Sequence, residues 1–239
     1  MSLTGNVNED RMEEVFNEVS EKFEKVNNVL SNLNNDLIEK LDLKDDDPES
    51  FDKAMEYSVG NEYTLRLNHT NELCNEIITS YSKALIFNEE IKNRPLDEKA
   101  LQNWFEYYAK YAIRQLGTLD DYIYHYLNTF NRYEIPVEMG FNGKVKGMLN
   151  NDGKSNVVKE LTRYSKLNKY RNDITHNLNP FRNIVGYRVK EEVEGVEVDL
   201  LKVTEPTIKT NNEFITIFEE SVTKLVEKFE NVYAENKKS

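Results

Sequence analysis

Apolar residues recur every three or four positions through most of this sequence, and that spacing places them on one face of an α-helix. Only nine glycines and five prolines occur among the 239 residues, so few positions interrupt the pattern. The third helical stretch is apolar nearly all round, which is typical of the central helix of a bundle. The periodicity predicts long helices over residues 8–41, 62–92, 97–130, 155–178 and 212–235.

The pattern changes from helical to alternating after residue 183. Apolar and charged residues alternate on either side of Glu194-Gly195, which is typical of two strands and their turn. We therefore predict a β-hairpin over residues 184–204, inserted before the C-terminal helix. Residues 131–153 contain one proline and four glycines and are predicted to be irregular, with one helical turn at 144–149. A loop of this length could cover a functional site.

Together these elements predict one all-α domain over residues 1–239, an up-and-down bundle of four or five long helices with an added hairpin. A chain of this length can bury a sizeable core. No run approaches eighteen apolar residues, so no membrane span is predicted. The polar, acidic N-terminus does not have the pattern of a signal peptide. We therefore expect a cytoplasmic protein without a membrane partner.

The residue types that usually hold metals and cofactors are sparse. Cys74 is the only cysteine, which excludes an internal disulfide and a cysteine-based metal site. The three histidines are scattered and no glycine-rich phosphate loop is present, so no metal and no cofactor is predicted. His69 is expected to be exposed on its helix, and His125 is expected at the edge of the core.

The chain is acidic overall, with a formal net charge of −12, but one segment is strongly basic. Residues 154–190 hold nine basic and two acidic residues, so they carry +7, and the remainder, with 22 basic and 41 acidic residues, carries −19. The overall charge argues against non-specific coating of nucleic acid. A local basic patch can still select phosphate groups. The alternative is a solvated helix face balanced by acidic residues elsewhere in the fold.

The centre of the basic segment is Leu161–Phe181, LTRYSKLNKYRNDITHNLNPF. At about 100° per residue, Asn172 and His176 share a polar face of the predicted helix, roughly opposite its apolar face. Arg171 falls on the shoulder of the apolar face and should be half-buried, where a guanidinium needs a partner.

The candidate partners of Arg171 are Asp120 and Asp121, in the middle of the helix predicted over 97–130. They lie in an aromatic stretch, where a charge is unexpected unless it is paired. The alternative is that both carboxylates simply face solvent.

The residue types of the segment fit proton transfer at a phosphate. Histidine titrates near neutral pH, so His176 could take or give a proton. Arg171 stays charged and offers a planar set of donors to phosphate oxygens, and Asn172 could orient the histidine or bind substrate. Together they could drive attack of an RNA 2′-hydroxyl on the adjacent phosphate without a metal. The alternative is a surface histidine and a core-edge arginine with an ion-pair partner.

The sequence Arg171-Asn172 followed by His176, in an otherwise helical chain, resembles the Arg-x4–6-His signature of the HEPN superfamily. Its members are all-α nucleases and nucleotide-binding modules. The resemblance implies metal-independent RNA cleavage with Arg171 and His176 catalytic and Asn172 supporting. It also implies a homodimer, because two copies of the motif usually meet across a dimer to form one site. The residues expected to bind RNA around the motif are Lys166, Lys169, Thr175 and Asn179.

Two classes of function are therefore open. The first is a HEPN-type endoribonuclease that acts on RNA as a homodimer, in a toxin–antitoxin or defence setting, with a protein antitoxin as a candidate partner. The second is a non-catalytic HEPN-like module that binds a nucleotide or a protein partner, which the acidic bulk of the chain favours. A helical scaffold in which the motif is a coincidence is the third reading.

Overall fold

The computed structural model describes residues 9–40, 49, 63–163, 181, 184–193, 196–204 and 208–238, and the structural statements below concern these residues. A one-turn 3-10 helix, η1 (Pro95–Asp97), leads into α4. The prediction of an all-α bundle is confirmed. The α-helices are α1 (Glu9–Lys40), α3 (Tyr63–Asn93), α4 (Glu98–Phe130), α5 (Phe141–Asn151), α6 (Ser155–Arg163) and α8 (Asn211–Lys238).

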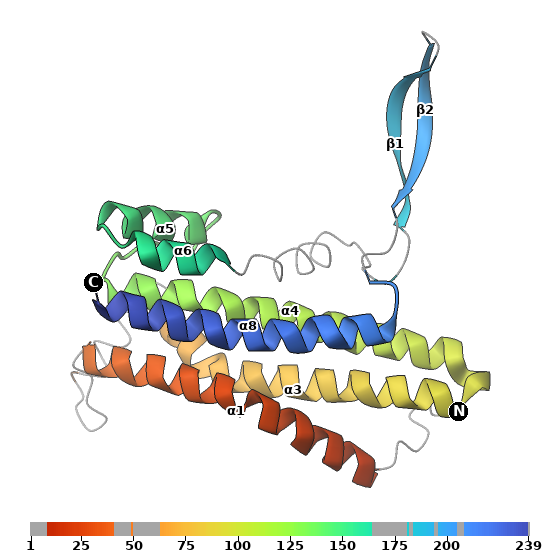
Figure 1. Cartoon of the computed structure of the whole chain (residues 1–239), viewed down its shortest axis with the longest axis horizontal. Helices are drawn as coiled ribbons and strands as arrows, with labels where there is room; N and C mark the ends of the chain where they lie inside the picture. Colours follow the sequence, from red (N-terminus) through yellow and green to blue (C-terminus); the bar gives the residue numbers. More distant parts are fainter. Residues whose placement is uncertain are drawn as a thin grey trace.

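The four long helices α1, α3, α4 and α8 lie lengthwise beside one another, and α5 and α6 lie beside the C-terminal half of α4 and α8 (Figure 1). The rings of Phe105 and Phe214, near the starts of α4 and α8, are 5.6 Å apart, so these two helices begin at the same end of the bundle. Arg11 near the start of α1 binds Glu89 near the end of α3 at 2.8 Å. Helices α1, α4 and α8 therefore run in one direction and α3 runs in the other.

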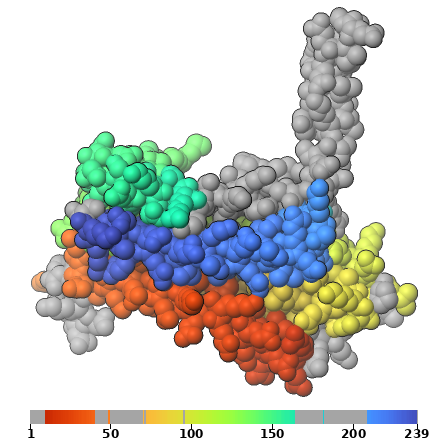
Figure 2. Space-filling model, in the orientation of Figure 1, coloured from red at the N-terminus to blue at the C-terminus, as the bar shows by residue number. Residues whose placement is uncertain are grey.

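Helix α8 lies across one face of the molecule between α1 and α6 (Figure 2). Its apolar residues recur at helical spacing, and they are buried against the other three long helices. Aromatic rings supply much of this packing; Phe218 of α8 stacks on Tyr81 of α3 with centroids 4.2 Å apart. The largest fully buried side chains of the core are Tyr81, Tyr126, Phe23, Phe105, Phe214, Phe218, Lys228, Phe229, Leu30, Leu33 and Leu37.

The helix that is apolar nearly all round is not buried all round, because the first half of α4 is partly open to solvent. Trp104, Tyr107 and Tyr111 are 37%, 55% and 36% exposed. By contrast, residues 122–129 are all buried. The physical reason is that α5 covers the second half of α4, where the ring of Phe141 stacks on His125, and no described element covers the outer face of the first half.

Residues 131–153 are not the mostly irregular loop that we predicted, because α5 takes up eleven of them, or about three turns. Phe141, Val145 and Leu149 recur every four residues, and all three are buried. Gly143 and Gly147, which suggested a loop, lie within α5, and a Cβ atom at either position would contact nothing. Gly140, with φ at +84°, supplies the left-handed residue from which α5 begins. The burial of one apolar face therefore outweighs the conformational cost of the two internal glycines.

Strands β1 (Ile184–Val193) and β2 (Val196–Thr204) pair in antiparallel fashion, with Val193 opposite Val196. The register is irregular between Ile184 and Tyr187. The prediction that these strands form a hairpin inserted into the helical fold before α8 stays a prediction.

Phe218→Ala should lower the free energy of unfolding by about 3–5 kcal/mol, because it removes a fully buried ring from the core. The matched control is Phe16→Ala, whose ring is 37% exposed on α1 and whose loss should change stability by less than about 0.5 kcal/mol. Urea unfolding followed by circular dichroism measures both values. Equal effects of the two substitutions would contradict the packing of α8 on α3.

Cys74 should be protected from thiol reagents in the folded protein. The side chain is 1% exposed, and burial raises the pKa of its thiol to about 12. Because the thiolate is the reactive form, labelling at about pH 8 should be far slower in buffer than in urea. Cys74→Ser, which has no thiol, gives the background rate. Labelling at the same rate in buffer and in urea would show that Cys74 is not in the core.

Candidate functional site

The residues expected to form the active site lie outside the described residues. The description ends at Arg163 of α6 and resumes with Phe181. The helix predicted over 155–178 is therefore seen only as α6, and His69 likewise has no described side chain. The expected site residues in the undescribed part are Lys166, Lys169, Arg171, Asn172, Thr175, His176 and Asn179.

The described residues on either side of this segment are held against α4 and α8. Leu161 is buried, and Glu160 accepts a hydrogen bond from Asn231 of α8 at 3.3 Å. At the other end, the ring of Phe181 lies 5.8 Å from that of Phe105 and 5.7 Å from that of Phe214. The chain therefore leaves α6 beside the C-terminal part of α8 and returns beside its first turn.

A buried ion pair joins α4 to α8 close to α6. Lys228 donates to Asp120 at 2.6 Å, and the two side chains are only 2% and 4% exposed. Two charges withdrawn from water are costly unless they are paired at short range, so each residue needs the other. The expectation that Asp120 faces solvent is wrong. Its pairing with Arg171 stays a prediction, while Asp121 is half-buried and accepts a hydrogen bond from Asn142 of α5 at 2.9 Å.

Lys228 was missed by the sequence analysis, although the signal is present. Leu225 and Val232, three residues before it and four after it, both belong to the buried face of α8. A lysine at this spacing is therefore on the apolar face of the helix, and a buried acidic partner is required.

Two lysines lie over one buried tyrosine ring beside this ion pair. The ammonium of Lys228 is 5.4 Å from the centroid of Tyr124, and that of Lys146 on α5 is 5.6 Å from it. Burial raises the pKa of the Tyr124 hydroxyl, and the charges of Asp120 and Asp121 raise it further. Burial also lowers the pKa of Lys146, and the nearby Lys228 adds to this effect while Asp120 opposes it.

His125 is 2% exposed and stacks on Phe141 at 4.7 Å, so it lies inside the core rather than at its edge. A stacked, fully buried imidazole is a packing residue and cannot reach a polymeric substrate. A polar cluster is thus formed by Asp120, Tyr124, His125, Lys146 and Lys228. It fixes α5 and α8 on α4, next to the point where the segment of Arg171 begins.

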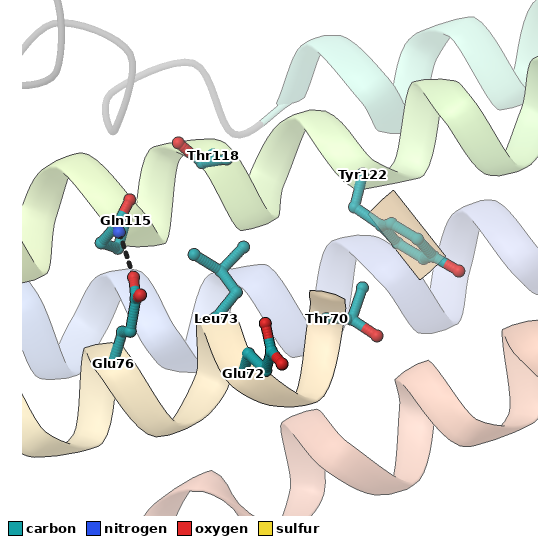
Figure 3. Close-up of a pocket in the computed structure, with 7 residues that line it drawn as sticks. All are labelled: Thr70, Glu72, Leu73, Glu76, Gln115, Thr118 and Tyr122. Atoms are coloured by element: carbon teal, nitrogen blue, oxygen red, sulfur yellow. Dashed lines mark hydrogen bonds between the residues drawn. The ribbon is translucent and has the colours of Figure 1, made fainter. Parts of the chain in front are cut away.

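A cavity of about 290 Å³ lies between α3 and α4, on another face of α4 (Figure 3). Glu76 accepts hydrogen bonds there from Tyr111, at 3.1 Å, and from Gln115. The residues that line the cavity are Thr70, Glu72, Leu73, Glu76, Gln115, Thr118 and Tyr122. Two carboxylates and no basic residue line it, so a phosphate would be repelled and this cavity is not an RNA site.

A family model described as HEPN_Cthe2314-like HEPN matches residues 63–236. The chain belongs to the HEPN superfamily. The match covers α3 through most of α8 and leaves out α1, which nonetheless packs against α3 and α8 in the bundle. Membership places this HEPN protein among all-α nucleases and nucleotide-binding modules.

No curated protein and no solved structure matched the chain. Within the described ranges, no helix of the HEPN protein combines the length and the apolar character needed to cross a lipid bilayer. The described residues also contain no group of three or more histidines, cysteines and acids arranged to hold a metal ion.

Removing one partner of the buried ion pair should destabilise the protein more than removing both. Asp120→Leu and Lys228→Met should each cost about 3–5 kcal/mol, because each leaves a buried charge without its partner. The double variant should recover most of that loss, which urea unfolding of all four proteins measures. The exposed pair Lys224 and Glu220, 3.3 Å apart, is the matched control, and its removal should change stability by less than about 1 kcal/mol. Simple additivity of the two core substitutions would contradict a direct pairing.

Proposed function

We propose that this HEPN protein is a metal-independent endoribonuclease that acts as a homodimer. Arg171 and His176 are its catalytic residues in this proposal, and Asn172 supports them. The observation that carries the proposal is the match of the HEPN family model over residues 63–236, because that range includes the Arg171-to-His176 motif.

In the proposed reaction, the imidazole of His176 removes the proton of an RNA 2′-hydroxyl, and the oxygen attacks the adjacent phosphorus. The bond from phosphorus to the 5′ oxygen breaks, and that oxygen takes a proton from the His176 of the second subunit. Arg171 stabilises the charge that develops on the phosphoryl oxygens. The products are a 2′,3′-cyclic phosphate end and a 5′-hydroxyl end.

The described residues on either side of the motif segment are anchored on opposite halves of α8. Glu160 accepts a hydrogen bond from Asn231, and Phe181 packs on Phe214. These two α8 residues are 17 positions apart, or about 25 Å at 1.5 Å per residue. The segment that carries the motif is therefore tied to the bundle at both ends.

The charge distribution supports RNA as the substrate. The segment from Lys154 to Lys190 carries +7 in a chain of net charge −12, so phosphate would be drawn to the motif more than to the acidic bulk of the chain. Lys166 and Lys169 would contact RNA phosphates, and Thr175 and Asn179 would donate hydrogen bonds to the RNA. An enzyme of this activity needs restraint in the cell, so a protein antitoxin is the partner that we propose.

A non-catalytic module that binds a protein or a nucleotide is the second candidate. The observation that favours it is the acidic character of the described surface, including the cavity bounded by Glu72 and Glu76. A basic protein segment would suit that cavity better than a nucleotide, because its charge is opposite to that of the carboxylates.

The purified protein should cleave single-stranded RNA in the presence of EDTA and leave 2′,3′-cyclic phosphate ends. His176→Ala and Arg171→Ala should each lower the cleavage rate by at least about 100-fold, because each removes a group that acts in the transition state. Lys224→Ala is the matched control. Its side chain is exposed and pairs with Glu220 on α8, so cleavage should be unchanged.

Sedimentation of the same variants separates loss of catalysis from loss of assembly. Wild-type and His176→Ala proteins should both be dimers, since the substitution removes a reacting group and not the dimer contact. Cleavage in EDTA that survives His176→Ala would eliminate the proposed active site. A fully active monomer would contradict a site formed by two subunits, but it would not contradict a catalytic role for His176.

A further inference from the structure

Four aromatic side chains form one cluster where α3 ends and α4 begins, and we call Phe87, Trp104, Tyr107 and Tyr108 the aromatic platform. Three of the rings are nearly parallel. Phe87 lies 5.7 Å from Tyr108 at 7° and 6.2 Å from Trp104 at 19°, while Trp104 and Tyr108 are 6.0 Å apart at 25°. Tyr107 meets Trp104 edge-on at 84° and so closes one side of the stack.

The platform is open to solvent. Tyr107 is 55% exposed and Trp104 is 37% exposed, whereas the other two rings are partly buried beneath them. Large aromatic residues that are grouped and exposed usually mark a binding surface, because burying them against a ligand is favourable. The platform lies at one end of the bundle, where the chain passes from α3 to α4 (Figure 1).

Basic side chains flank the platform on two sides. The ammonium of Lys83 is 5.1 Å from the centroid of Tyr108, on the α3 side. Lys110 and Arg114 follow Tyr107 by three and seven residues, so they lie about one and two turns further along the same face of α4. None of the three forms an ion pair with a described residue. In a chain with 43 acidic and 31 basic residues, such uncompensated cations suit an anionic partner.

Acidic residues limit the platform at its two ends. Glu90 and Asp97 lie near the α3–α4 turn, but both pair with Arg94, at 3.8 and 2.8 Å. In the other direction, Glu76 accepts a hydrogen bond from the hydroxyl of Tyr111 and borders the acidic cavity of Figure 3. The surface is therefore acidic on the α3 side of Tyr111, so a polyanion could extend over Trp104 and Tyr107 toward Arg114 but not into the cavity.

We propose that the aromatic platform binds single-stranded RNA, with unpaired bases stacked on Trp104 and Tyr107 and phosphates held by Lys83, Lys110 and Arg114. Flat exposed rings accept any unpaired base, and flanking cations follow the backbone. A duplex offers no free base faces, so the platform selects single strands. The proposal takes RNA as the ligand from the proposed ribonuclease function, but it uses none of the residues assigned to catalysis.

Trp104 is the only tryptophan of the chain, so its fluorescence reports directly on the platform. The full chain carrying His176→Ala, which should cut RNA at least about 100-fold more slowly, is titrated with oligo(U) and oligo(A) of about ten nucleotides. We expect saturable quenching that weakens with salt. A duplex of the same length should bind at least about 10-fold more weakly, since its bases are already stacked.

Tyr107→Ala should weaken the binding of single strands by about 10-fold, because it removes the most exposed ring. Phe16→Ala, an exposed ring on α1, is the matched control and should bind like the parent protein. Replacing Lys110 and Arg114 by Gln should reduce the slope of log affinity against log salt by about 0.7 for each phosphate contact that is lost. Circular dichroism confirms that each variant is folded.

The proposal falls if single-stranded RNA leaves Trp104 fluorescence unchanged, if Tyr107→Ala binds as tightly as the parent, or if duplex binds equally well. It also falls if Trp104 emission shifts with protein concentration alone, because the platform would then be a contact between protein copies. Wild-type cleavage without platform binding would overturn this inference and leave the nuclease intact. Platform binding without cleavage would support it and overturn the nuclease.

Discussion

The position of α8 in this bundle depends on the buried ammonium group of Lys228, which pairs with Asp120. Lys228 lies on the apolar face of its helix, between Leu225 and Val232, and is 2% exposed. Sliding α8 along α4 would separate Lys228 from Asp120 and leave two buried charges without compensation. The pair thus adds little net free energy compared with a hydrophobic pair, but it penalises every alternative register of the two helices.

A second lysine of α8 also pairs with a buried carboxylate, although this lysine is itself 45% exposed. Lys237 pairs with Asp36 of α1, a carboxylate that is 8% exposed and also accepts the hydroxyl of Tyr126 at 2.8 Å. The partners of Lys228 and Lys237 thus come from different helices, α4 and α1. Helix α8 is therefore positioned against both neighbours by charge, while its phenylalanines supply the apolar burial. The segment of Arg171, which precedes α8 in the chain, starts and ends against helices fixed in this way.

The long helices could be predicted from sequence because each buries one regular apolar stripe. Predicted and observed limits of α1, α3, α4 and α8 differ by three residues or fewer. Helix α5 was predicted as a single turn at 144–149, because Gly143 and Gly147 suggested a loop and hid the apolar repeat of Phe141, Val145 and Leu149. Tertiary packing decides which apolar face is covered by a neighbouring helix. The exposed start of α4 and the pairing of Lys228 with Asp120 could therefore not be predicted from the pattern of a single helix. The motif from Arg171 to His176 was found by residue types and spacing, and both its catalytic role and its geometry stay predictions.

The common direction of α1, α4 and α8 has an electrical consequence for the whole molecule. Peptide dipoles add along each helix, leaving partial positive charge at its N-terminus and partial negative charge at its C-terminus. Helix α3 opposes the other three long helices and offsets only about one of them, so the bundle keeps a net macrodipole. Its positive pole lies at the end where α4 and α8 begin. Among the described long helices, three N-termini and one C-terminus therefore lie at that end, where the backbone contributes partial positive charge.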